Sequence, residues 1–195
     1  MKPKMRSMKL SSKRKEVMEM AIQEQKYKSA KTSINSGRLP AIVRIWEDCL
    51  HMDASILDYG CGKFDNTREY LEARGFEYYG YDPYNRPDQE NRLAMEKYGY
   101  NYAILSNVLN VIAEESVRLQ ILQTIKDHLI LDGLLYIKIY EGNGSGVMKV
   151  DEKRNSCQLN KKTREYLPEI EKVFPRGVTE HWIQGVHVIL AWKRG

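Results

Sequence analysis

The segment SILDYGCGKFDNTREYLEARG, residues 55–75, decides the fold of this chain. It opens with a short apolar run, residues 55–59, that is typical of a buried strand. Two glycines separated by one residue, Gly60 and Gly62, then let the backbone turn tightly and approach a ligand. Residues 66–74 carry the pattern of a helix, which a glycine ends. The segment therefore predicts a strand, a glycine turn and a helix in succession.

The alternation of strands and helices continues along the chain. The apolar pattern predicts strands over residues 78–81, 102–106, 134–140, 178–183 and 186–192, and helices from about 40 to 50, 114 to 130 and 163 to 173. Asp132-Gly133 is expected to stop the longest helix, and Gln184-Gly185 to turn a terminal antiparallel pair. Strands separated by helices imply an α/β domain with a mostly parallel sheet and helices on both faces.

Charge divides the chain into an arm and a domain. Residues 1–31 hold 10 Lys and Arg against 3 Glu, residues 32–148 hold 11 against 17 acids, and residues 149–195 hold 10 against 6. We expect a basic N-terminal arm with a polar helix over residues 1–30, and the domain proper over 31–195. Basic ends favour an acidic partner such as nucleic acid, although a solvated basic terminus accounts for the arm equally well. Together with the arm, a C-terminal basic cluster could rim an acidic substrate; its members are Lys149, Lys153, Arg154, Lys161, Lys162 and Arg164.

Composition excludes several classes of protein. The chain has 195 residues, of which 42% are apolar, enough for one compact domain. It contains no run of about 18 apolar residues, and its basic start lacks an apolar segment, so we expect no membrane span, no secretory signal and a cytoplasmic location. Cys49, Cys61 and Cys157 are odd in number and widely spaced. We therefore expect neither a disulfide framework nor a structural metal.

Acidic side chains around the glycine turn indicate which cofactor it holds. Asp58 precedes the turn, and Asp65 stands where the third glycine of a dinucleotide-binding GxGxxG would be. Both would repel a pyrophosphate, so NAD and FAD fit poorly. Asp82 follows 22 residues after Gly60, at the end of the next strand, where a carboxylate can accept hydrogen bonds from ribose hydroxyls. S-adenosylmethionine (SAM), which carries an ammonium and a sulfonium and no phosphate, fits these charges.

Three segments then carry a family resemblance. Leu57-Asp-Tyr-Gly-Cys-Gly62, Gly80-Tyr-Asp-Pro83 and Leu131-Asp-Gly-Leu-Leu-Tyr-Ile137 resemble the motifs of class I SAM-dependent methyltransferases. The resemblance covers roughly residues 40–195. Together with Lys31-Thr32 and Asn107-Val-Leu-Asn-Val-Ile112, these segments are also similar to short bacterial and phage-borne methyltransferase-like proteins. The family implies a Rossmann-like sheet of strand order 3-2-1-4-5-7-6.

One departure from the family pattern concerns its third strand. Only 19 residues separate Asp82 from Tyr102, where the family usually fits a helix, a strand and another helix. We therefore expect the third strand to be missing or reduced. Its loop normally contacts the adenine, so another group must do so here: Tyr81, Pro83 or Tyr84 on the ring, and Asn107 or nearby backbone on its edge.

The predicted site combines both lines of reasoning. Lys31, together with Thr32, is expected from the resemblance to form a lid. The cofactor-binding residues are predicted to be Lys31, Asp58, Tyr59, Gly60, Cys61, Gly62, Asp82, Pro83 and Asn107. Methyl transfer from a sulfonium needs alignment and, for some acceptors, a general base. Asn107, Tyr140 and Glu141, at the ends of two predicted strands, are the candidate catalytic residues.

Absent motifs narrow the chemistry. The segment after residue 106 lacks the Pro-Pro turn of enzymes that methylate exocyclic amines in DNA, and Cys157 does not follow the proline typical of cytosine C5 methyltransferases. The four histidines are expected to be structural or exposed. We predict a SAM-dependent methyltransferase that acts on a nucleic acid or another anionic acceptor. The alternatives are a small-molecule methyltransferase and a non-catalytic SAM-binding or nucleic-acid-binding module. A nucleotide-dependent oxidoreductase is disfavoured by the acids at the turn.

Overall fold

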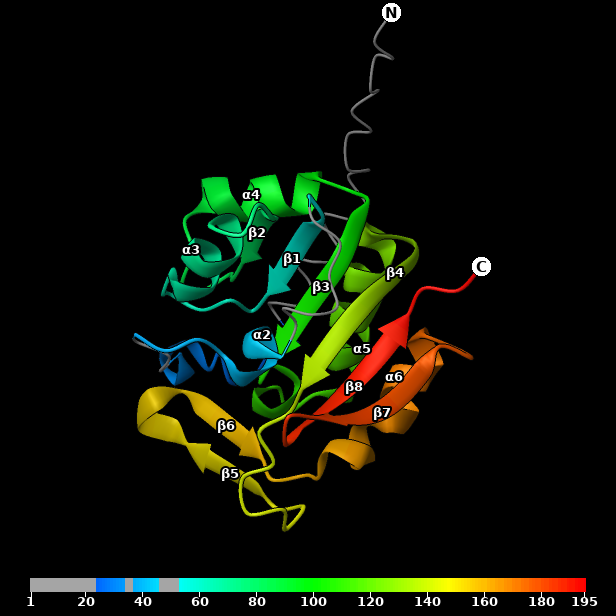
Figure 1. The fold of residues 1–195 in the computed structure, drawn as a ribbon. Helices are drawn as coiled ribbons and strands as arrows, with labels where there is room; N and C mark the ends of the chain where they lie inside the picture. The colour runs from blue at the N-terminus through cyan, green and yellow to red at the C-terminus, as the bar shows by residue number, and fades with distance from the viewer. Residues whose placement is uncertain (1–23, 34–36, 46–52) are drawn as a thin grey trace, which may run out of the picture.

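A six-stranded sheet forms the centre of the computed structural model, which describes residues 24–33, 37–45 and 53–195 (Figure 1). Its strand order is β2-β1-β3-β4-β8-β7. The strands are β1 (Ser55–Tyr59), β2 (Glu77–Tyr81), β3 (Tyr100–Ser106), β4 (Leu129–Lys138), β7 (Val178–Ile183) and β8 (Val186–Trp192). Strands β2, β1, β3 and β4 run parallel, whereas β8 and β7 are antiparallel to their neighbours. The predicted α/β sheet with a C-terminal antiparallel hairpin is confirmed.

The strand order is the family order without its third strand. β2 lies at the edge of the sheet, and the helix α4 (Asp88–Glu96) packs beside it where the missing unit would be. Asn91 of α4 accepts a hydrogen bond from the Asp82 amide at 2.9 Å and donates to the carbonyls of Asp82 and Arg86. The sequence predicted the shortening but not this helix, which fixes the loop after β2.

Helices cover both faces of the sheet because its strands alternate two apolar sets. Leu57, Ala103 and Leu135 face α4, α5 (Glu115–His128) and α6 (Leu167–Val173). Ile56, Ile104 and Tyr136 face α2 (Ala41–Arg44) and α3 (Asn66–Glu72). Burial on both faces explains the continuous apolar runs from which the strands were predicted.

The prediction for Asp132-Gly133 was wrong. Helix α5 already ends at His128, and β4 begins at Leu129, so the pair lies inside the strand. The register of β4 with β3 shifts there, and Asp132 adopts a left-handed φ of 59°. A Cβ on Gly133 would lie 2.9 Å from the Ile130 carbonyl oxygen. The residues that signal a helix end therefore form an irregularity of the strand instead.

A second, two-stranded sheet was not predicted. β5 (Met148–Asp151) pairs antiparallel with β6 (Ser156–Leu159), and the short helix η3 (Glu152–Arg154) joins them. Figure 1 shows this β5–β6 hairpin beyond the carboxyl ends of β1, β3 and β4. The N-terminal segment with the helix η1 (Ala30–Thr32) lies beside it. The remaining short helices are η2 (Leu109–Val111), after β3, and η4 (Thr163–Tyr166), before α6.

Parts of two sequence predictions lie outside the described residues. Most of the predicted basic arm and its polar helix fall there, as does the end of the predicted helix from about residue 40 to 50, of which the structure describes α2. Among the helices that the structure describes, none is long and apolar enough to cross a membrane.

Candidate functional site

A cleft of about 660 Å³ lies at the carboxyl ends of the parallel strands. The loops after β1, β2 and β3 form its floor, and η1 and the β5–β6 hairpin form its walls. In open α/β sheets ligands bind at this edge, between loops of neighbouring strands. Of the predicted site residues, the cleft brings together Lys31, Tyr59, Gly60, Cys61, Gly62, Asp82, Pro83, Asn107 and Tyr140.

The glycine turn takes a shape that side chains would obstruct. Gly60 and Gly62 have φ values of 79° and 72°, in the left-handed region that favours glycine. A Cβ on Gly60 would lie 2.4 Å from Val108 Cγ2, and one on Gly62 would lie 2.3 Å from Ser33 Oγ. Both glycines are therefore required by conformation and by close packing at the floor of the cleft.

Asp82 ties the turn to the loop after β2. Its Oδ2 accepts from the Gly62 amide at 3.0 Å, and its Oδ1 accepts from the amides of Tyr84 and Asn85, each at 3.0 Å. The side-chain amide of Asn85 adds a fourth hydrogen bond at 3.1 Å. Three of these four hydrogen bonds go to Oδ1 and one goes to Oδ2, so Oδ2 keeps one of its two acceptor positions for a ligand hydroxyl.

Arg86 holds the other side of the same turn. Its guanidinium donates from Nε to the Gly62 carbonyl and from Nη2 to the Phe64 carbonyl, both at 2.7 Å, and it pairs with Asp65. The charge of Asp65 is therefore balanced within the protein. The argument that Asp65 repels a pyrophosphate is weakened by this ion pair, which the sequence did not indicate.

Asp58 lies in β1, directly before the glycine turn, and Cys61 is part of the turn. Asp58 is buried and absent from the lining of the cleft, and its Oδ2 accepts from the Tyr78 hydroxyl at 2.9 Å. Burial raises the pKa of Asp58 to about 7 and that of the Cys61 thiol to about 12. The Cys61 thiol is therefore protonated at neutral pH, and Asp58 acts on the turn from the strand and not from the cleft.

The N-terminal segment crosses the cleft and is fixed at several points. The Ser29 amide donates to the Asn155 carbonyl, and Ser29 Oγ donates to the Val111 carbonyl, each at 2.9 Å. Gln25 accepts from the Tyr84 hydroxyl at 2.8 Å, and Ser33 Oγ accepts from the Lys63 amide at 3.2 Å. We call residues 24–33 the roof. Lys31 lies on the roof, and a role for it as a lid residue stays a prediction.

The candidate catalytic residues are separated by the structure. Asn107 is exposed, has a left-handed φ of 58° and lines the cleft, as does Tyr140, whose exposed fraction is 58%. Glu141 does not line it: its Oε1 accepts from the Thr163 amide at 2.7 Å and lies 3.9 Å from His187 Nδ1. The hydrogen bond from Thr163 lowers the pKa of Glu141, which disfavours it as a proton acceptor.

Asn110 and Gln158 are among the cleft residues that the sequence reasoning did not predict as site residues. Asn110, in η2, is 1% exposed, and its Nδ2 donates to Gln158 Oε1 of β6 at 3.0 Å. Among the described residues its Oδ1 has no hydrogen-bond partner. Asn110 lies within the quoted segment Asn107-Val-Leu-Asn-Val-Ile112, but Gln158 belongs to a hairpin that no pattern indicated, so sequence alone could not join them.

Positive charge surrounds the cleft. Lys28 and Lys31 reach it from the roof, and Lys149 and Arg154 from the β5–β6 hairpin, whereas Asp82 and Asp151 are its acidic lining residues. Within the described ranges no ion pair involves Lys28, Lys31 or Lys149, while Arg154 lies 3.6 Å from Asp151. No histidine that the structure describes lines the cleft, and neither do Lys153, Lys161, Lys162 and Arg164 of the predicted basic cluster.

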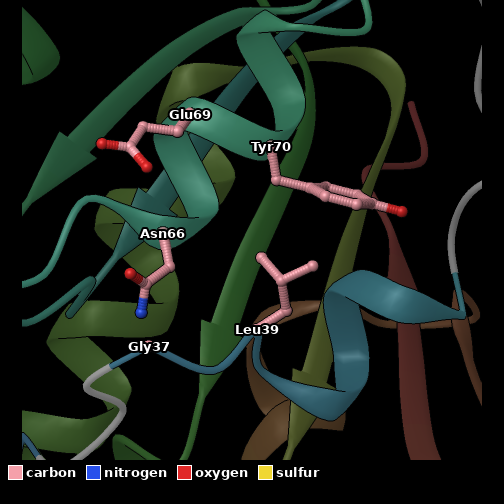
Figure 2. Close-up of a pocket in the computed structure, with 5 residues that line it drawn as sticks. All are labelled: Gly37, Leu39, Asn66, Glu69 and Tyr70. Carbon is pink, nitrogen blue, oxygen red and sulfur yellow. The ribbon is translucent and has the colours of Figure 1, made fainter.

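A second hollow of about 340 Å³ lies between α3 and the segment before α2 (Figure 2). Leu39 lies beneath α3, next to Tyr70, and Asn66 Nδ2 donates to the Arg38 carbonyl at 3.3 Å. Glu69 is the acid that lines it. This hollow gathers none of the predicted site residues, so the cleft is the candidate site.

The fold and the cleft define an α/β enzyme with a ligand site at the glycine turn, and comparison with known proteins names the family. A model described as "Methyltransferase domain" matches residues 22–176, and the chain belongs to this family. No curated protein sequence matches the chain. It is a SAM-dependent methyltransferase, as predicted.

Solved structures share the fold at low sequence identity. A Burkholderia thailandensis 1,6-didemethyltoxoflavin-N1-methyltransferase, with 1,6-didemethyltoxoflavin and S-adenosylhomocysteine bound, has a TM-score of 0.62 at 17% identity, covering 95% of this chain and 92% of its own. A SAM-dependent methyltransferase from Methanosarcina mazei has a TM-score of 0.56 at 15% identity, covering 80% and 98%. A TehB-like SAM-dependent methyltransferase from Corynebacterium glutamicum has a TM-score of 0.54 at 18% identity, covering 82% and 91%.

The residues of the cleft fit SAM. Gly60 and Gly62 line the cleft, and because they lack side chains a ligand can approach the backbone of the turn closely. Asp82 offers a carboxylate beside it, suited to ribose hydroxyls, and Pro83 and Tyr84 offer flat apolar surface for an adenine. Tyr81, the other predicted ring contact, is buried in the core instead.

Proposed function

We propose that this methyltransferase acts on an acceptor that carries a negative charge. The observation that carries the proposal is the ring of four cations, Lys28, Lys31, Lys149 and Arg154, around the mouth of the cleft. Three of them have no ion-pair partner among the described residues, so their charge is available to a ligand. Clustered charges of one sign concentrate ligands of the opposite sign and guide their approach.

The cofactor end and the acceptor end follow from the strand order. SAM, when bound, would supply the methyl group of a sulfonium: the acceptor would gain the methyl group as the carbon–sulfur bond breaks, and S-adenosylhomocysteine would leave. Asp82 and the glycine turn would hold it at the ends of β2 and β1. Asn107 and Tyr140 follow β3 and β4, so they stand on the other side of the cleft and are proposed to contact the acceptor.

The acceptor side of the cleft offers alignment and charge. Asp151 is the carboxylate of the lining outside the cofactor end, where Asp82 is engaged in four hydrogen bonds. Burial raises the pKa of the Cys157 thiol to about 11, so it is protonated at neutral pH. We propose that Asn107 and Tyr140 accelerate methyl transfer by positioning the nucleophile in a desolvated cleft. Of the two, Tyr140 has the hydroxyl group that could carry the proton of the nucleophile.

The test compares two pairs of charge removals. Lys149→Gln with Arg154→Gln removes the hairpin cations of the cleft, and Lys153→Gln with Arg164→Gln removes the same charge from exposed positions outside it. Formation of S-adenosylhomocysteine is measured with 4-aminobenzoate, 4-hydroxybenzoate, phosphoethanolamine, adenosine 5′-monophosphate and tRNA, each beside a neutral counterpart where one exists. We expect kcat/KM for anions to fall about tenfold in the first pair only, the scale of one lost charged contact. Equal turnover of the neutral counterparts by the unaltered enzyme contradicts the proposal.

The same assay separates nucleic acid from small anions. A small anionic acceptor suits the walled cleft, and the toxoflavin-precursor enzyme, which shares the fold, has a small molecule bound. A nucleic acid would bring further phosphates to the basic residues outside the cleft. Removal of residues 1–23 keeps the roof, and we propose that it reduces the salt dependence of tRNA binding if the arm contributes. An unchanged slope removes the arm from substrate recognition.

A further inference from the structure

The amide pair Asn110 and Gln158 has only one arrangement that satisfies its surroundings. Gln158 Nε2 lies 3.0 Å from the Tyr140 carbonyl oxygen and 2.8 Å from the Leu159 carbonyl oxygen. Two carbonyl oxygens accept hydrogen bonds, so the nitrogen of the amide must face them and not its oxygen. Gln158 Oε1 is thereby directed at Asn110.

The orientation of Gln158 determines that of Asn110. Oε1 is an acceptor and therefore requires the Asn110 Nδ2 donor, which lies 3.0 Å away. Asn110 Oδ1 is left as the free end of the relay. It has no hydrogen-bond partner among the residues that the structure describes, and the whole residue is 1% exposed.

A buried hydrogen-bond acceptor without a partner is costly, and native proteins rarely leave one unexplained. Both members of the pair line the cleft. Since Gln158 prevents Asn110 from turning its amide over, the protein holds this oxygen in place at that cost. A ligand that donates a hydrogen bond to Asn110 Oδ1 would recover this cost.

The strand order places Asn110 Oδ1 on the far side of the cleft from Asp82. Across the sheet edge the loops follow in the order Asp82 after β2, Gly60 after β1, Asn110 after β3 and Tyr140 after β4. Asn110 also packs against the hairpin through β6 and Gln158. It belongs to the acceptor end and not to the cofactor end.

We propose that Asn110 Oδ1 selects acceptors that present an N–H or O–H group in the cleft, and that Gln158 positions it. The proposal rests on the proposed function and deepens it: the acceptor carries a negative charge for the hairpin cations and a hydrogen-bond donor for Asn110. Acceptors that bring no N–H or O–H group to this oxygen, for example through a tertiary amine or a pyridine nitrogen, are disfavoured because the cost of the free oxygen is then not recovered.

The first experiment decides whether the cofactor donates a hydrogen bond to Asn110 Oδ1. Binding of S-adenosylhomocysteine is measured by calorimetry for the unaltered protein, for Asn110→Leu and for Asn160→Leu. Asn160 is the matched control because it is a buried amide that does not line the cleft, and its Nδ2 donates to the Val147 carbonyl. We expect affinities within about twofold for Asn110→Leu. A tenfold loss confined to Asn110→Leu assigns the oxygen to the cofactor and overturns the proposal.

The second experiment uses the acceptors of the charge test with donor-free analogues, among them 4-(dimethylamino)benzoate and nicotinate. The unaltered enzyme should prefer 4-aminobenzoate and 4-hydroxybenzoate. Asn110→Leu and Gln158→Leu should lower kcat/KM for them about tenfold while the affinity for S-adenosylhomocysteine is kept. Equal rates in Asn110→Leu, or equal use of the donor-free analogues, overturn the proposal although the charge test still succeeds.

If no anion is methylated, the proposed function fails and the inference is judged by a crystal structure with S-adenosylhomocysteine. The free oxygen should then have no partner other than water. A hydrogen bond to it from the cofactor, or from a protein group, overturns the proposal.

Discussion

The two ends of the cleft are built in different ways. The cofactor end consists of backbone and carboxylate groups that hold one another: the Gly62 peptide donates to Asp82 and accepts from Arg86. The proposed acceptor end includes side chains on the roof and the β5–β6 hairpin, among them cations with no ion-pair partner among the described residues. A cofactor common to a whole family is met by fixed backbone, whereas the acceptor is met by side chains that can be exchanged without disturbing the sheet.

The largest effect is expected from Gly62→Ala, which attacks the cofactor end directly. The new Cβ would lie 2.3 Å from Ser33 Oγ at a φ of 72°. Calorimetry should show the affinity for SAM lowered by about thirtyfold, since such strain costs about 1–3 kcal/mol. Gly75→Ala is the control, because its φ is 84° but nothing lies within 4 Å of its Cβ. Equal losses in both would assign the effect to backbone strain alone.

Asp82→Ala tests the carboxylate of the same end. We expect SAM affinity to weaken by about 1–3 kcal/mol, the cost of leaving hydroxyl and amide donors without a partner. Asp132→Ala, at an exposed strand position, should leave affinity unchanged. An Asp82→Ala protein that binds SAM as the unaltered protein does would remove Asp82 from the site.

Asp58→Asn tests whether the buried Asp58 carboxyl, which does not line the cleft, is protonated in the folded protein. The buried carboxyl has its pKa raised to about 7, so the folded protein holds a proton that the unfolded chain releases near pH 4. Its stability contribution is present below pH 4 and is lost as the pH rises toward 7.

Chemical denaturation of the Asp58→Asn protein at pH 5 and pH 8 measures this loss. The variant should gain on the order of 2 kcal/mol relative to the unaltered protein at the higher pH. Asp132→Asn serves as the exposed control. A difference that does not change with pH would mean that Asp58 is ionised throughout.

Arg86→Gln tests how far the turn depends on its neighbour loop. The variant loses charge-assisted hydrogen bonds to the Gly62 and Phe64 carbonyls. We expect SAM affinity to fall about tenfold and Arg86→Lys to recover part of it. Arg68→Gln is the matched control, since Arg68 pairs with Glu90 on the surface of the same region. A loss of thermal stability with unchanged affinity would show that Arg86 serves the fold only.

The smallest effect is expected from Glu141→Gln, at the acceptor end. Its carboxylate accepts from the Thr163 amide and does not line the cleft. Methyl transfer should stay within about twofold, while unfolding free energy falls by about 1 kcal/mol. A large drop in kcat with a shifted pH profile would instead identify Glu141 as the general base.

The cofactor end could be predicted because its signals are local. The glycines of the turn and the acid at the end of a strand could each be identified from a single position. The missing strand could be identified from the short interval between Asp82 and Tyr102. The ion pair of Asp65 with Arg86 escaped because its partners are 21 residues apart in a loop of no regular pattern. Asp132-Gly133 misled because the same residues end helices and distort strands.

At the proposed acceptor end single residues were predicted, among them Asn107 and Tyr140, but the contacts that join its distant segments were not. β5 and β6 are short and half polar, β5 is exposed, and hydrogen bonds to Ser29, Asn110 and Tyr140 hold β6. A period-2 pattern of four residues does not distinguish such strands from a loop. Asn110 was therefore not predicted as a site residue, and only the structure places Gln158 beside it.

The bond between Ser29 and Cys157 spans 128 positions. A ribosome releases the roof early and the hairpin late, so the growing polypeptide has a glycine turn long before it has a closed pocket. The nascent protein therefore cannot enclose its methyl donor until the hairpin has been synthesised, and refolding should likewise regain donor binding only when this long-range contact forms.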